Sequence, residues 1–175
     1  MPVEGRGSLP FALVHGESLV AAASWAVGEA GCQLYDASVP FDAVRRSGRD
    51  LLLHDPLCPL TPAGFLAEAA ARARETGRVV VAFREVTDTI KGRTGDRLGE
   101  TVDRAGLRTV VSPVVVPGPV LAGLEVLDAG EFPVLVGDLA TRAEIEWLEA
   151  PALARRVHDL EELAVLEALS RSQSG

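Results

Sequence analysis

The strongest constraint on the fold comes from two apolar runs that flank a helical segment in the middle of the chain. Residues 50–54 (DLLLH) and 78–83 (RVVVAF) are nearly continuous in apolar side chains, as strands buried on both faces are. The intervening residues 61–77 begin with threonine and proline and end with glycine, which are helix start and stop signals. A strand, a helix and a second strand in this order favour a right-handed crossover and a parallel sheet.

The remaining segments continue this alternation along the 175 residues. Short apolar runs predict further strands at 32–36, 107–116, 132–137 and 152–157. Helical periodicity or end signals predict helices at 17–31, 41–46, 117–130, 138–150 and 158–171. We therefore expect one α/β domain over 1–175, built as a three-layer α/β/α sandwich with a mainly parallel sheet. The polar residues 170–175 are expected to fray.

The segment 84–106 interrupts this alternation because it is polar and carries turn signals. Two β-compatible stretches, VTDTI and GETVD, flank the turn sequence KGRTGDR, which is typical of a two-stranded ribbon. An isolated ribbon is marginally stable in water, so it needs another surface to pack against. We expect the 84–106 ribbon to project from the sheet and to pack against another surface, for which a second subunit is one candidate.

Charge composition restricts the chemistry available to the chain. The formal net charge is -8, which argues against a nucleic-acid or anionic-membrane surface, and no apolar run reaches the length of a membrane-spanning helix. Lys91 is the single lysine among 17 basic residues. Phosphate chemistry would therefore depend on arginine, Lys91, a metal ion or backbone amides. Two cysteines without a metal-binding pattern, and an N-terminus without a signal-peptide pattern, lead us to expect a cytoplasmic protein.

Polar residues at the expected carboxyl ends of the strands are the first candidates for a site, because ligands of such sheets bind at this edge. The candidates are His54–Asp55, Ser112–Pro113 and the residues after Phe83. Asp55 directly follows a buried strand, where a carboxylate can hold Mg²⁺ against substrate phosphates. The alternative is that Asp55 only caps the turn before proline.

Two other segments are candidates for phosphate binding. Gly5, Arg6 and Gly7 form a short glycine-rich piece of the kind whose backbone amides can approach phosphates, although a flexible terminus is the alternative. The ribbon carries hydroxyl and charged side chains that form either a phosphate clamp or an ordinary solvated face. These are Thr87, Asp88, Thr89, Lys91, Arg93, Arg97, Asp103 and Arg104.

Four motifs occur in an order and spacing that are informative together. They are LLLHDPLCPLTP (51–62), VTDTIK (86–91), TVDRAGL (101–107) and the Ser-Pro pair at 112–113. They resemble the 2-C-methyl-D-erythritol 4-phosphate cytidylyltransferase family, in which the second and third motifs mark a ribbon that reaches across a homodimer. The resemblance covers about residues 50–116. It implies a glycosyltransferase-A-like nucleotidyltransferase fold and Mg²⁺-dependent transfer of CMP from CTP to a polyol phosphate in isoprenoid-precursor synthesis.

The resemblance also assigns roles to individual residues. Asp55 matches the family's magnesium-binding aspartate. Thr89 and Arg104 match ribbon residues that hold methylerythritol phosphate in the partner subunit. Ser112 stands where the family usually has a threonine, and it keeps a hydroxyl for substrate binding.

Other positions depart from the family pattern. The Gly5–Gly7 piece resembles a shortened nucleotide-binding loop that no strand precedes. Phe11 stands where a lysine would follow proline, and Cys58 replaces an arginine. Arg156, or Arg155 if the register differs by one, falls where the family has another lysine, and Arg156 is taken as the candidate catalytic cation.

Two hypotheses follow. The first is a divergent cytidylyltransferase of this type, and the second is a catalytically degenerate paralogue that serves as a dimeric ligand-binding or regulatory module. A phenylalanine cannot neutralise charge that develops on transferring phosphates. The family's cytosine-recognition motif is also not recognisable in 36–46. On chemical grounds these losses favour the second hypothesis slightly.

Overall fold

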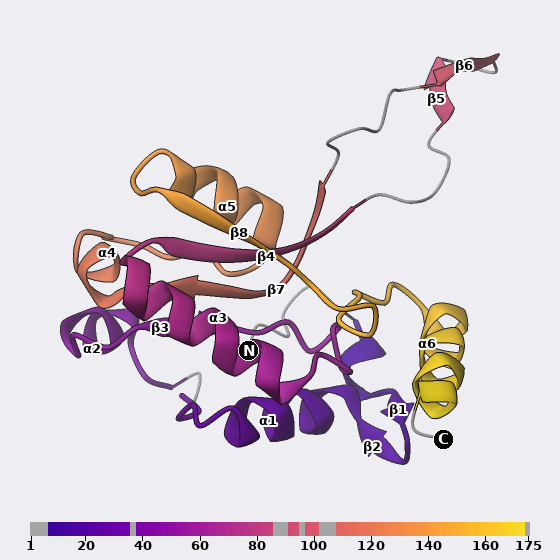
Figure 1. The fold of residues 1–175 in the computed structure, drawn as a ribbon, viewed down its shortest axis with the longest axis horizontal. Coiled ribbons are helices and arrows are strands. Elements are labelled where there is room, and N and C mark those ends of the chain that lie inside the picture. Colours follow the sequence, from indigo (N-terminus) through magenta and orange to yellow (C-terminus); the bar gives the residue numbers. More distant parts are fainter. Residues whose placement is uncertain (1–6, 36–37, 86–90, 95–96, 102–107, 174–175) are drawn as a thin grey trace.

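The structure is a computed structural model, and it describes residues 7–35, 38–85, 91–94, 97–101 and 108–173. Its helices are α1 (Leu19–Glu29), α2 (Phe41–Arg46), α3 (Ala63–Thr76), α4 (Gly118–Ala122), α5 (Phe132–Ala140) and α6 (Leu160–Gln173), with a short 3₁₀ turn η1 (Leu9–Phe11). Its strands are β1 (Leu13–Val14), β2 (Glu17–Ser18), β3 (Leu51–Leu53), β4 (Val79–Glu85), β5 (Lys91–Thr94), β6 (Arg97–Thr101), β7 (Arg108–Val116) and β8 (Ile145–Glu149). Figure 1 shows their arrangement.

Four strands form the central sheet in the spatial order β3-β7-β4-β8 (Figure 1). β7 is antiparallel to both of its neighbours, whereas β4 is parallel to β8. Three of these four strands therefore run in one direction, which confirms a mainly parallel sheet. β3 and β4 are parallel, as the strand-helix-strand pattern predicts, but β7 lies between them.

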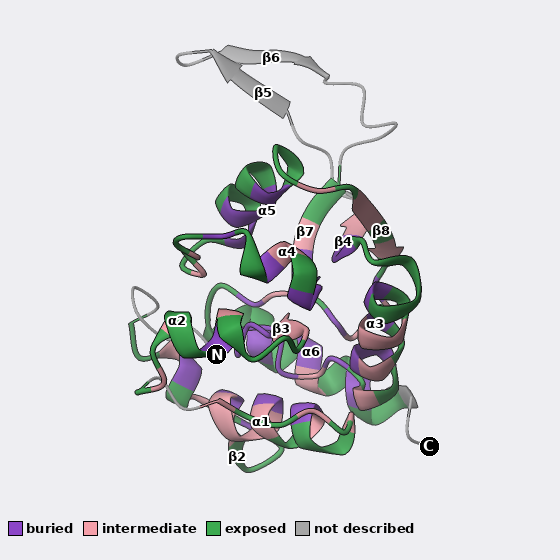
Figure 2. Cartoon of the chain, turned by 90° about the vertical axis from the view of Figure 1, so that its left-hand side faces the viewer, coloured by how far each residue is buried: buried purple, intermediate pink, exposed green. Residues whose placement is uncertain are grey.

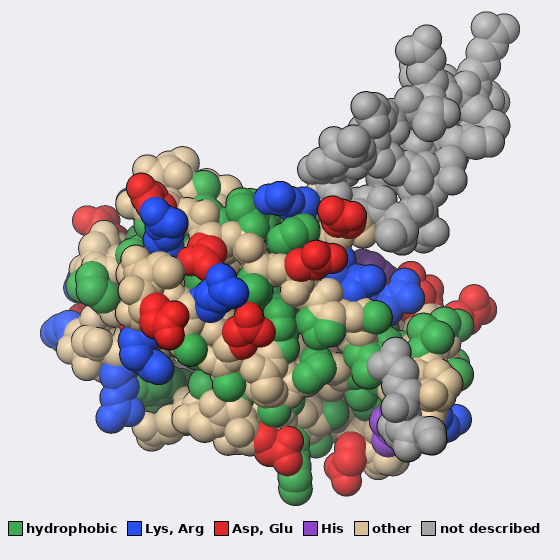
Figure 3. Space-filling model, in the orientation of Figure 1, with side chains coloured by type: hydrophobic (Ala, Val, Ile, Leu, Met, Phe, Trp, Pro, Cys, Tyr) green, Lys and Arg blue, Asp and Glu red, His purple; other side chains and the backbone are tan. Residues whose placement is uncertain are grey.

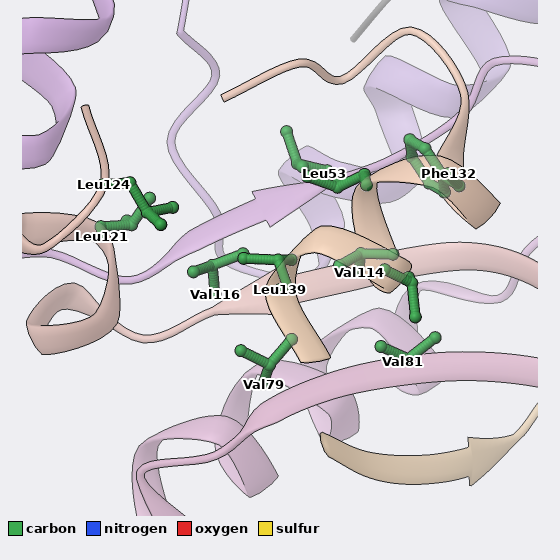
Figure 4. Packing of buried hydrophobic residues seen from close by; sticks show 11 residues of the cluster. Leu53, Val79, Val81, Val114, Val116, Leu121, Leu124, Phe132 and Leu139 are labelled. Carbon is green, nitrogen blue, oxygen red and sulfur yellow. The ribbon is translucent and has the colours of Figure 1, made fainter. Parts of the chain in front are cut away.

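Helices cover both faces of the sheet, in agreement with the expected layers (Figure 1). On one face, Val79 and Val81 of β4 and Val114 and Val116 of β7 pack against apolar side chains of α4 and α5 (Figure 4). The alternate residues of the same strands contact α3 on the other face, and α1 packs against α3. Buried positions accordingly gather on the inward sides of the helices in Figure 2.

Helix α3 confirms the strongest helix prediction, with one difference at its start. Pro62, not Thr61, is the N-cap residue, and the Thr61 hydroxyl donates instead to the Cys58 carbonyl at 2.9 Å. The helix ends at Gly77, which has a φ of +67°. Glycine adopts this left-handed conformation without steric cost, so the predicted stop signal acts as expected.

The predictions for 132–150 were wrong. Residues 132–137, expected to form a strand, belong to α5, which has proline in its first turn. The buried side chains of α5 follow the helical period of 3.6 residues and are Phe132, Leu135, Val136 and Leu139. Residues 138–150, expected to form a helix, contain the end of α5 and then β8. β8 lies at the edge of the sheet, where a strand can alternate polar and apolar side chains.

Four smaller differences concern two expected strands that are absent and two helices whose lengths differ from the prediction. No strand is present in 32–35 or in 152–157, although strands were expected there. The helix expected over 117–130 is limited to the short α4. α6 continues to Gln173 and so includes most of the segment expected to fray.

A second sheet lies between β4 and β7 in the sequence. Here β5 and β6 pair in antiparallel fashion, which confirms a two-stranded ribbon within 84–106. At the start of β7, the Arg108 guanidinium carbon lies 4.5 Å from the centre of the Phe83 ring and 5.5 Å from that of the Trp147 ring. Cation–π contacts of this kind fix the point where the chain rejoins the central sheet.

The junction between β7 and α4 packs closely against the residues before β3. A Cβ atom on Gly118 would lie 2.6 Å from the carbonyl oxygen of Gly48, which is too close for any side chain. The Gly118 amide donates to Asp50 Oδ1 at 2.9 Å. This contact aligns the start of β3 with the end of β7 and so helps to set their register.

Charged side chains of both signs are mixed on one face of the described part of the molecule (Figure 3). On the face drawn in Figure 3, basic and acidic side chains are interspersed between apolar ones. Within the described part of the chain, no helix has the length and apolar character needed to cross a membrane.

Candidate functional site

A bulge in β7 brings the middle of that strand to the end of β3. Regular pairing between β4 and β7 is interrupted at Ala82, which faces three residues of β7, 111–113. Ser112 lies in the middle of this bulge and precedes a cis peptide bond to Pro113. Bulges redirect side chains, and this one places the Ser112 hydroxyl beside the backbone of Asp55.

Ser112 connects His54 and Asp55. Its Oγ accepts a hydrogen bond from the Asp55 amide at 2.9 Å and forms a second hydrogen bond with Nδ1 of His54. All three side chains are buried. Ser112 therefore orients the backbone that carries the Asp55 carboxylate.

The Asp55 carboxylate is held on both oxygens. Oδ1 accepts from the Leu57 amide at 2.9 Å, and Oδ2 accepts from Nε of Arg156 at 3.0 Å. The Asp55 side chain is only 4% exposed, whereas that of Arg156 is 26% exposed. The guanidinium group of Arg156 is therefore partly accessible at the surface, whereas the Asp55 carboxylate is buried beneath it.

Arg156 reaches this position through the irregular segment that joins β8 to α6. Backbone hydrogen bonds tie the segment to the body of the protein at both ends, from Ala150 to Phe83 and from Val157 to Leu57, each at 2.8 Å. Arg156 and Asp55 are 101 residues apart in the sequence. The strand expected at 152–157 is replaced by a connection whose ends are fixed by the sheet and by the turn after β3.

Burial dominates the electrostatics of His54. It lowers the pKa of the imidazole from 6.5 to about 4, although the neighbouring Asp55 carboxylate acts in the opposite direction. The imidazole is therefore neutral near neutral pH. Its Nε2 atom is buried and has no hydrogen-bond partner among the residues that the structure describes.

The structure brings together three of the predicted site residues, Asp55, Ser112 and Arg156. Ser112 is fully buried against Asp55, so its direct contact with a substrate stays a prediction. Thr89 and Arg104 lie outside the described residues. Their roles in binding an acceptor phosphate therefore stay predictions as well.

At the N-terminus, Gly5 and Arg6 also lie outside the described residues. Gly7 is exposed and has a φ of +59°, just before η1. Phe11, at the position where the resemblance implies a lysine, is 65% exposed, and Cys58 is fully buried. A nucleotide-binding role of this segment stays a prediction.

The residues at the end of β3 are compatible with a single carboxylate ligand for Mg²⁺. No group of three or more His, Cys, Asp or Glu side chains able to hold a metal occurs in the described part of the chain. Mg²⁺ is commonly held by one or two carboxylates while substrate phosphates supply further oxygens. Because a carboxylate oxygen can accept more than one partner, the bonds to Leu57 and Arg156 leave this possibility open for Asp55.

A cavity of about 730 Å³ adjoins the site and was missed by the sequence predictions. It runs along all three residues of β3 and reaches His54. Its other walls come from α1, α3, β7 and the segments 31–35 and 48–50. Because these segments are scattered along the sequence, no local spacing could have indicated the cavity.

Comparison with curated proteins gives two partial matches, while no family model matches the chain. The chain is 35% identical over 101 residues to the 2-C-methyl-D-erythritol 4-phosphate cytidylyltransferase of Corynebacterium efficiens, covering 58% of this chain and 36% of that protein. It is 36% identical over 72 residues to the bifunctional enzyme IspD/IspF of Solidesulfovibrio magneticus, covering 41% and 18%. The chain thus spans little more than a third of the first relative and less of the second.

Solved structures match over nearly the whole chain. The cytidylyltransferase of Thermus thermophilus superposes with a TM-score of 0.69 at 22% identity, covering 94% of this chain and 95% of that one. The 4-diphosphocytidyl-2C-methyl-D-erythritol synthase of Anaerococcus prevotii gives 0.65 at 11% identity, covering 94% and 92%. The chain therefore has the α/β fold of these solved structures. More particularly, the fold is that of the 2-C-methyl-D-erythritol 4-phosphate cytidylyltransferases, and the curated matches confirm the resemblance indicated by the sequence.

Proposed function

We propose that the chain is a cytidylyltransferase of the methylerythritol phosphate type, which transfers CMP from CTP to a polyol phosphate and releases pyrophosphate. The observation that carries this proposal is the Asp55–Arg156 pair at the end of β3. It lies at the carboxyl end of a strand, where such sheets bind their ligands. The curated matches support this hypothesis over the non-catalytic one.

Arg156 is the residue best placed to act on phosphates. Asp55 occupies its Nε, so the two terminal nitrogens can donate to phosphate oxygens in the planar geometry that arginine offers. The reaction is an in-line attack by an acceptor phosphate oxygen on the α-phosphate of CTP. Catalysis of this kind depends mainly on positioning and on neutralising charge, and Arg156 serves both.

Asp55 has a dual role in this proposal. It orients Arg156, and it is the residue that would hold Mg²⁺ together with the phosphates of CTP. The metal would supply further neutralisation of the phosphate charge. Ser112 positions Asp55 through its amide, which accounts for a hydroxyl at this buried place in β7.

The acceptor and the remaining phosphates involve segments outside the described residues. We propose that Thr89 and Arg104 bind the acceptor phosphate and that Gly5, Arg6 and Gly7 contact CTP. Substituting Arg104 by alanine should then raise the KM for the polyol phosphate more than the KM for CTP. An equal effect on both substrates would contradict this assignment.

The proposed dimer has its own test. If the 84–106 ribbon joins two copies, light scattering should give twice the chain mass of 18.4 kDa. A monomeric mass at assay concentrations would remove the reason to place Thr89 and Arg104 in a partner's site.

Pyrophosphate release tests the activity. Purified protein is incubated with CTP, Mg²⁺ and methylerythritol phosphate, and the Asp55→Asn and Arg156→Gln variants are compared with the wild type. Removing one group that neutralises charge should lower the rate by about 10²–10³-fold. Asp42→Asn is the matched control, because Asp42 is an exposed carboxylate on α2 that pairs only with arginines of the same helix in the described structure.

Two results would overturn the proposal. The first is no pyrophosphate release together with no stabilisation of the folded protein by CTP in thermal unfolding. That result would support the degenerate paralogue instead. The second is release that persists unchanged in both the Asp55 and the Arg156 variant, which would remove these residues from the mechanism.

A further inference from the structure

The turn between β1 and β2 holds His15 in an unusual backbone conformation. Val14 pairs with Glu17, so His15 and Gly16 form a two-residue hairpin turn. Both have positive φ angles, +51° for His15 and +86° for Gly16, as the primed turns of such hairpins require. In the described part of the chain, His15 is the one residue other than glycine with such an angle. This conformation is strained for a residue with a side chain, and it persists where other contacts hold it in place.

Three contacts to α6 hold His15. Its amide donates to Glu167 Oε1 at 2.9 Å, and its Nδ1 lies 3.5 Å from the same oxygen. Its Nε2 lies 2.7 Å from the Ser170 hydroxyl, which donates to the Glu167 carbonyl oxygen at 2.8 Å and so accepts from Nε2. The hydrogen bond from the His15 amide lowers the pKa of the Glu167 carboxyl below its ordinary value. We call the contacts of His15 with Glu167 and Ser170 the α6 clamp.

Helix α6 depends on this clamp because only one of its sides is packed within the described structure. Leu163 and Leu166 are buried, whereas Leu160, Val165 and Leu169 stay exposed. The buried side packs with residues of the hairpin, and α6 lies beside β1 (Figure 1). A helix packed on a single side has few contacts that resist its displacement, and the directional hydrogen bonds of the α6 clamp supply such contacts.

The apolar cluster under α6 also supports the Asp55–Arg156 pair. Its buried members include residues of α6, of β1 and of the neighbours of the pair, and these are Val14, Leu57, Val157, Leu163 and Leu166. Leu57 donates its amide to Asp55 Oδ1 at 2.9 Å, and its carbonyl oxygen accepts from the Val157 amide at 2.8 Å. Val157 directly follows Arg156 in the sequence. A displacement of α6 in this cluster therefore moves the backbone that carries Arg156.

The start of α6 is fastened to the segment that carries Arg156. The His158 amide donates to the Glu162 carboxylate at 2.9 Å, and the Glu162 amide donates to Asp159 Oδ1 at 2.8 Å. Reciprocal bonds of this kind join the first turn of a helix to the residues before it. Residues 151–159 contain no helix or strand of their own, so Arg156 takes its position from the elements to which this segment is tied.

We propose that His15 is a positioning residue for Arg156. By holding Glu167 and Ser170 it fixes α6 on the hairpin, and α6 in turn fixes the backbone of Arg156 beside Asp55. This role rests on the proposed function, in which Arg156 neutralises charge on the phosphates. A misplacement of about 1 Å can lower the rate of a reaction by about 10²-fold. Loss of the α6 clamp should therefore slow the reaction without removing any group that touches the substrate.

Exchange of the Arg156 Nε–H with water tests this role directly in the intact protein labelled with ¹⁵N. The Arg156→Lys variant assigns the signal, because lysine has no guanidinium group. His15→Gly removes the α6 clamp and keeps a residue that favours a positive φ, and Ser170→Ala removes one bond of the α6 clamp. Ser172→Ala is the matched control, since Ser172 is an exposed serine of α6 that likewise donates to the carbonyl oxygen three residues earlier.

We expect the Arg156 Nε–H to exchange about fivefold to tenfold faster in His15→Gly and in Ser170→Ala, as loss of one hydrogen bond would produce. Ser172→Ala should exchange like the wild type. Unchanged exchange in both variants of the α6 clamp would overturn the proposal. An equal acceleration at the amides of β4 and β7 would also overturn it, because that pattern indicates a loss of overall stability and not a local displacement.

Enzyme kinetics provide a second readout, which a purely structural role of His15 would not give. His15→Gly should lower the rate of pyrophosphate release by about 10–100-fold. The same substitution should have no further effect in the Arg156→Gln variant, because a residue that acts through Arg156 has nothing left to position there. An equal loss of rate in both backgrounds would overturn the proposal.

These measurements separate the α6 clamp from the proposed reaction. If the wild type releases no pyrophosphate but Arg156 exchanges faster in the variants, the reaction is refuted and the α6 clamp remains the element that places Arg156. Release together with unchanged exchange would leave the reaction standing and refute the role of His15. If His15→Gly does not fold, Ser170→Ala decides, because it removes only a hydroxyl group.

Discussion

Acidification should destabilise this protein through His54. The pKa of the folded imidazole is about 4, below the ordinary value of 6.5, because burial disfavours its charged form. Between these two values the unfolded chain binds a proton that the folded protein does not bind. The contribution of His54 to the free energy of unfolding therefore rises with pH through this window. It is fully present above the unfolded pKa and is lost as the pH falls toward the folded pKa.

The size of the effect follows from the two pKa values. Lowering the pH from about 7 to about 5 costs about 2 kcal/mol through this single group. The full difference of 2.5 between 6.5 and 4 corresponds to about 3 kcal/mol, reached below the folded pKa. Domains of this kind have a total stability of about 5–15 kcal/mol, so the loss is a substantial fraction.

Urea unfolding followed by tryptophan fluorescence measures the effect. The chain has two tryptophans, Trp25 and Trp147, as probes. The wild type and the His54→Gln variant are each unfolded at about pH 7 and at about pH 5. The change in the free energy of unfolding between the two pH values is then compared between the two proteins. The difference is due to His54, because all other groups titrate in both proteins. The wild type should lose about 2 kcal/mol more than the variant on acidification. An equal loss in both proteins would refute the claim that His54 is buried in its neutral form.

Two further predictions concern close packing and the ion pair of the site. Gly118→Ala should destabilise the fold by about 1–3 kcal/mol in urea unfolding, because its Cβ would lie 2.6 Å from the Gly48 carbonyl oxygen. Gly137→Ala is its control, since open space surrounds that position in α5, and it should be neutral or stabilising by up to about 1 kcal/mol. Arg156→Met should destabilise by about 1–3 kcal/mol, because it leaves the Asp55 carboxylate buried without its cation. Adding Asp55→Asn should restore part of this loss, and a purely additive double variant would show that the pair is not coupled.

The sequence indicates much of the sheet correctly, for identifiable physical reasons. Continuous apolar runs mark β3, β4 and β7, because these strands are covered by helices on both faces. The predicted helix at 41–46 coincides with α2, and glycine ends α3 at the expected residue. In these places the local sequence signals match the burial and the helix ends that the structure shows.

The failures over 132–157 have a common cause. The run at 132–137 is too short and too apolar to separate a strand from a buried helix by periodicity, and only the spacing of its buried positions shows a helix. β8 is an edge strand whose residues are all partly or fully exposed, so it keeps polar side chains, and its sequence resembles that of an amphipathic helix. The Asp55–Arg156 contact joins residues that are distant in the sequence, and only the resemblance to a family pointed to Arg156.

The position of β7 between β3 and β4 has a consequence for how the chain folds during synthesis. β3 and β4 are complete once residue 85 has been made, but neither can pair with the other, because the strand that separates them ends at Val116. Both must stay open at their inner edges while the ribbon segment is translated. Pairing over such separations is slow, and unpaired apolar strands are prone to aggregate. We therefore expect chains truncated before β7 to be insoluble, and the ribbon's length to govern the rate at which the sheet closes.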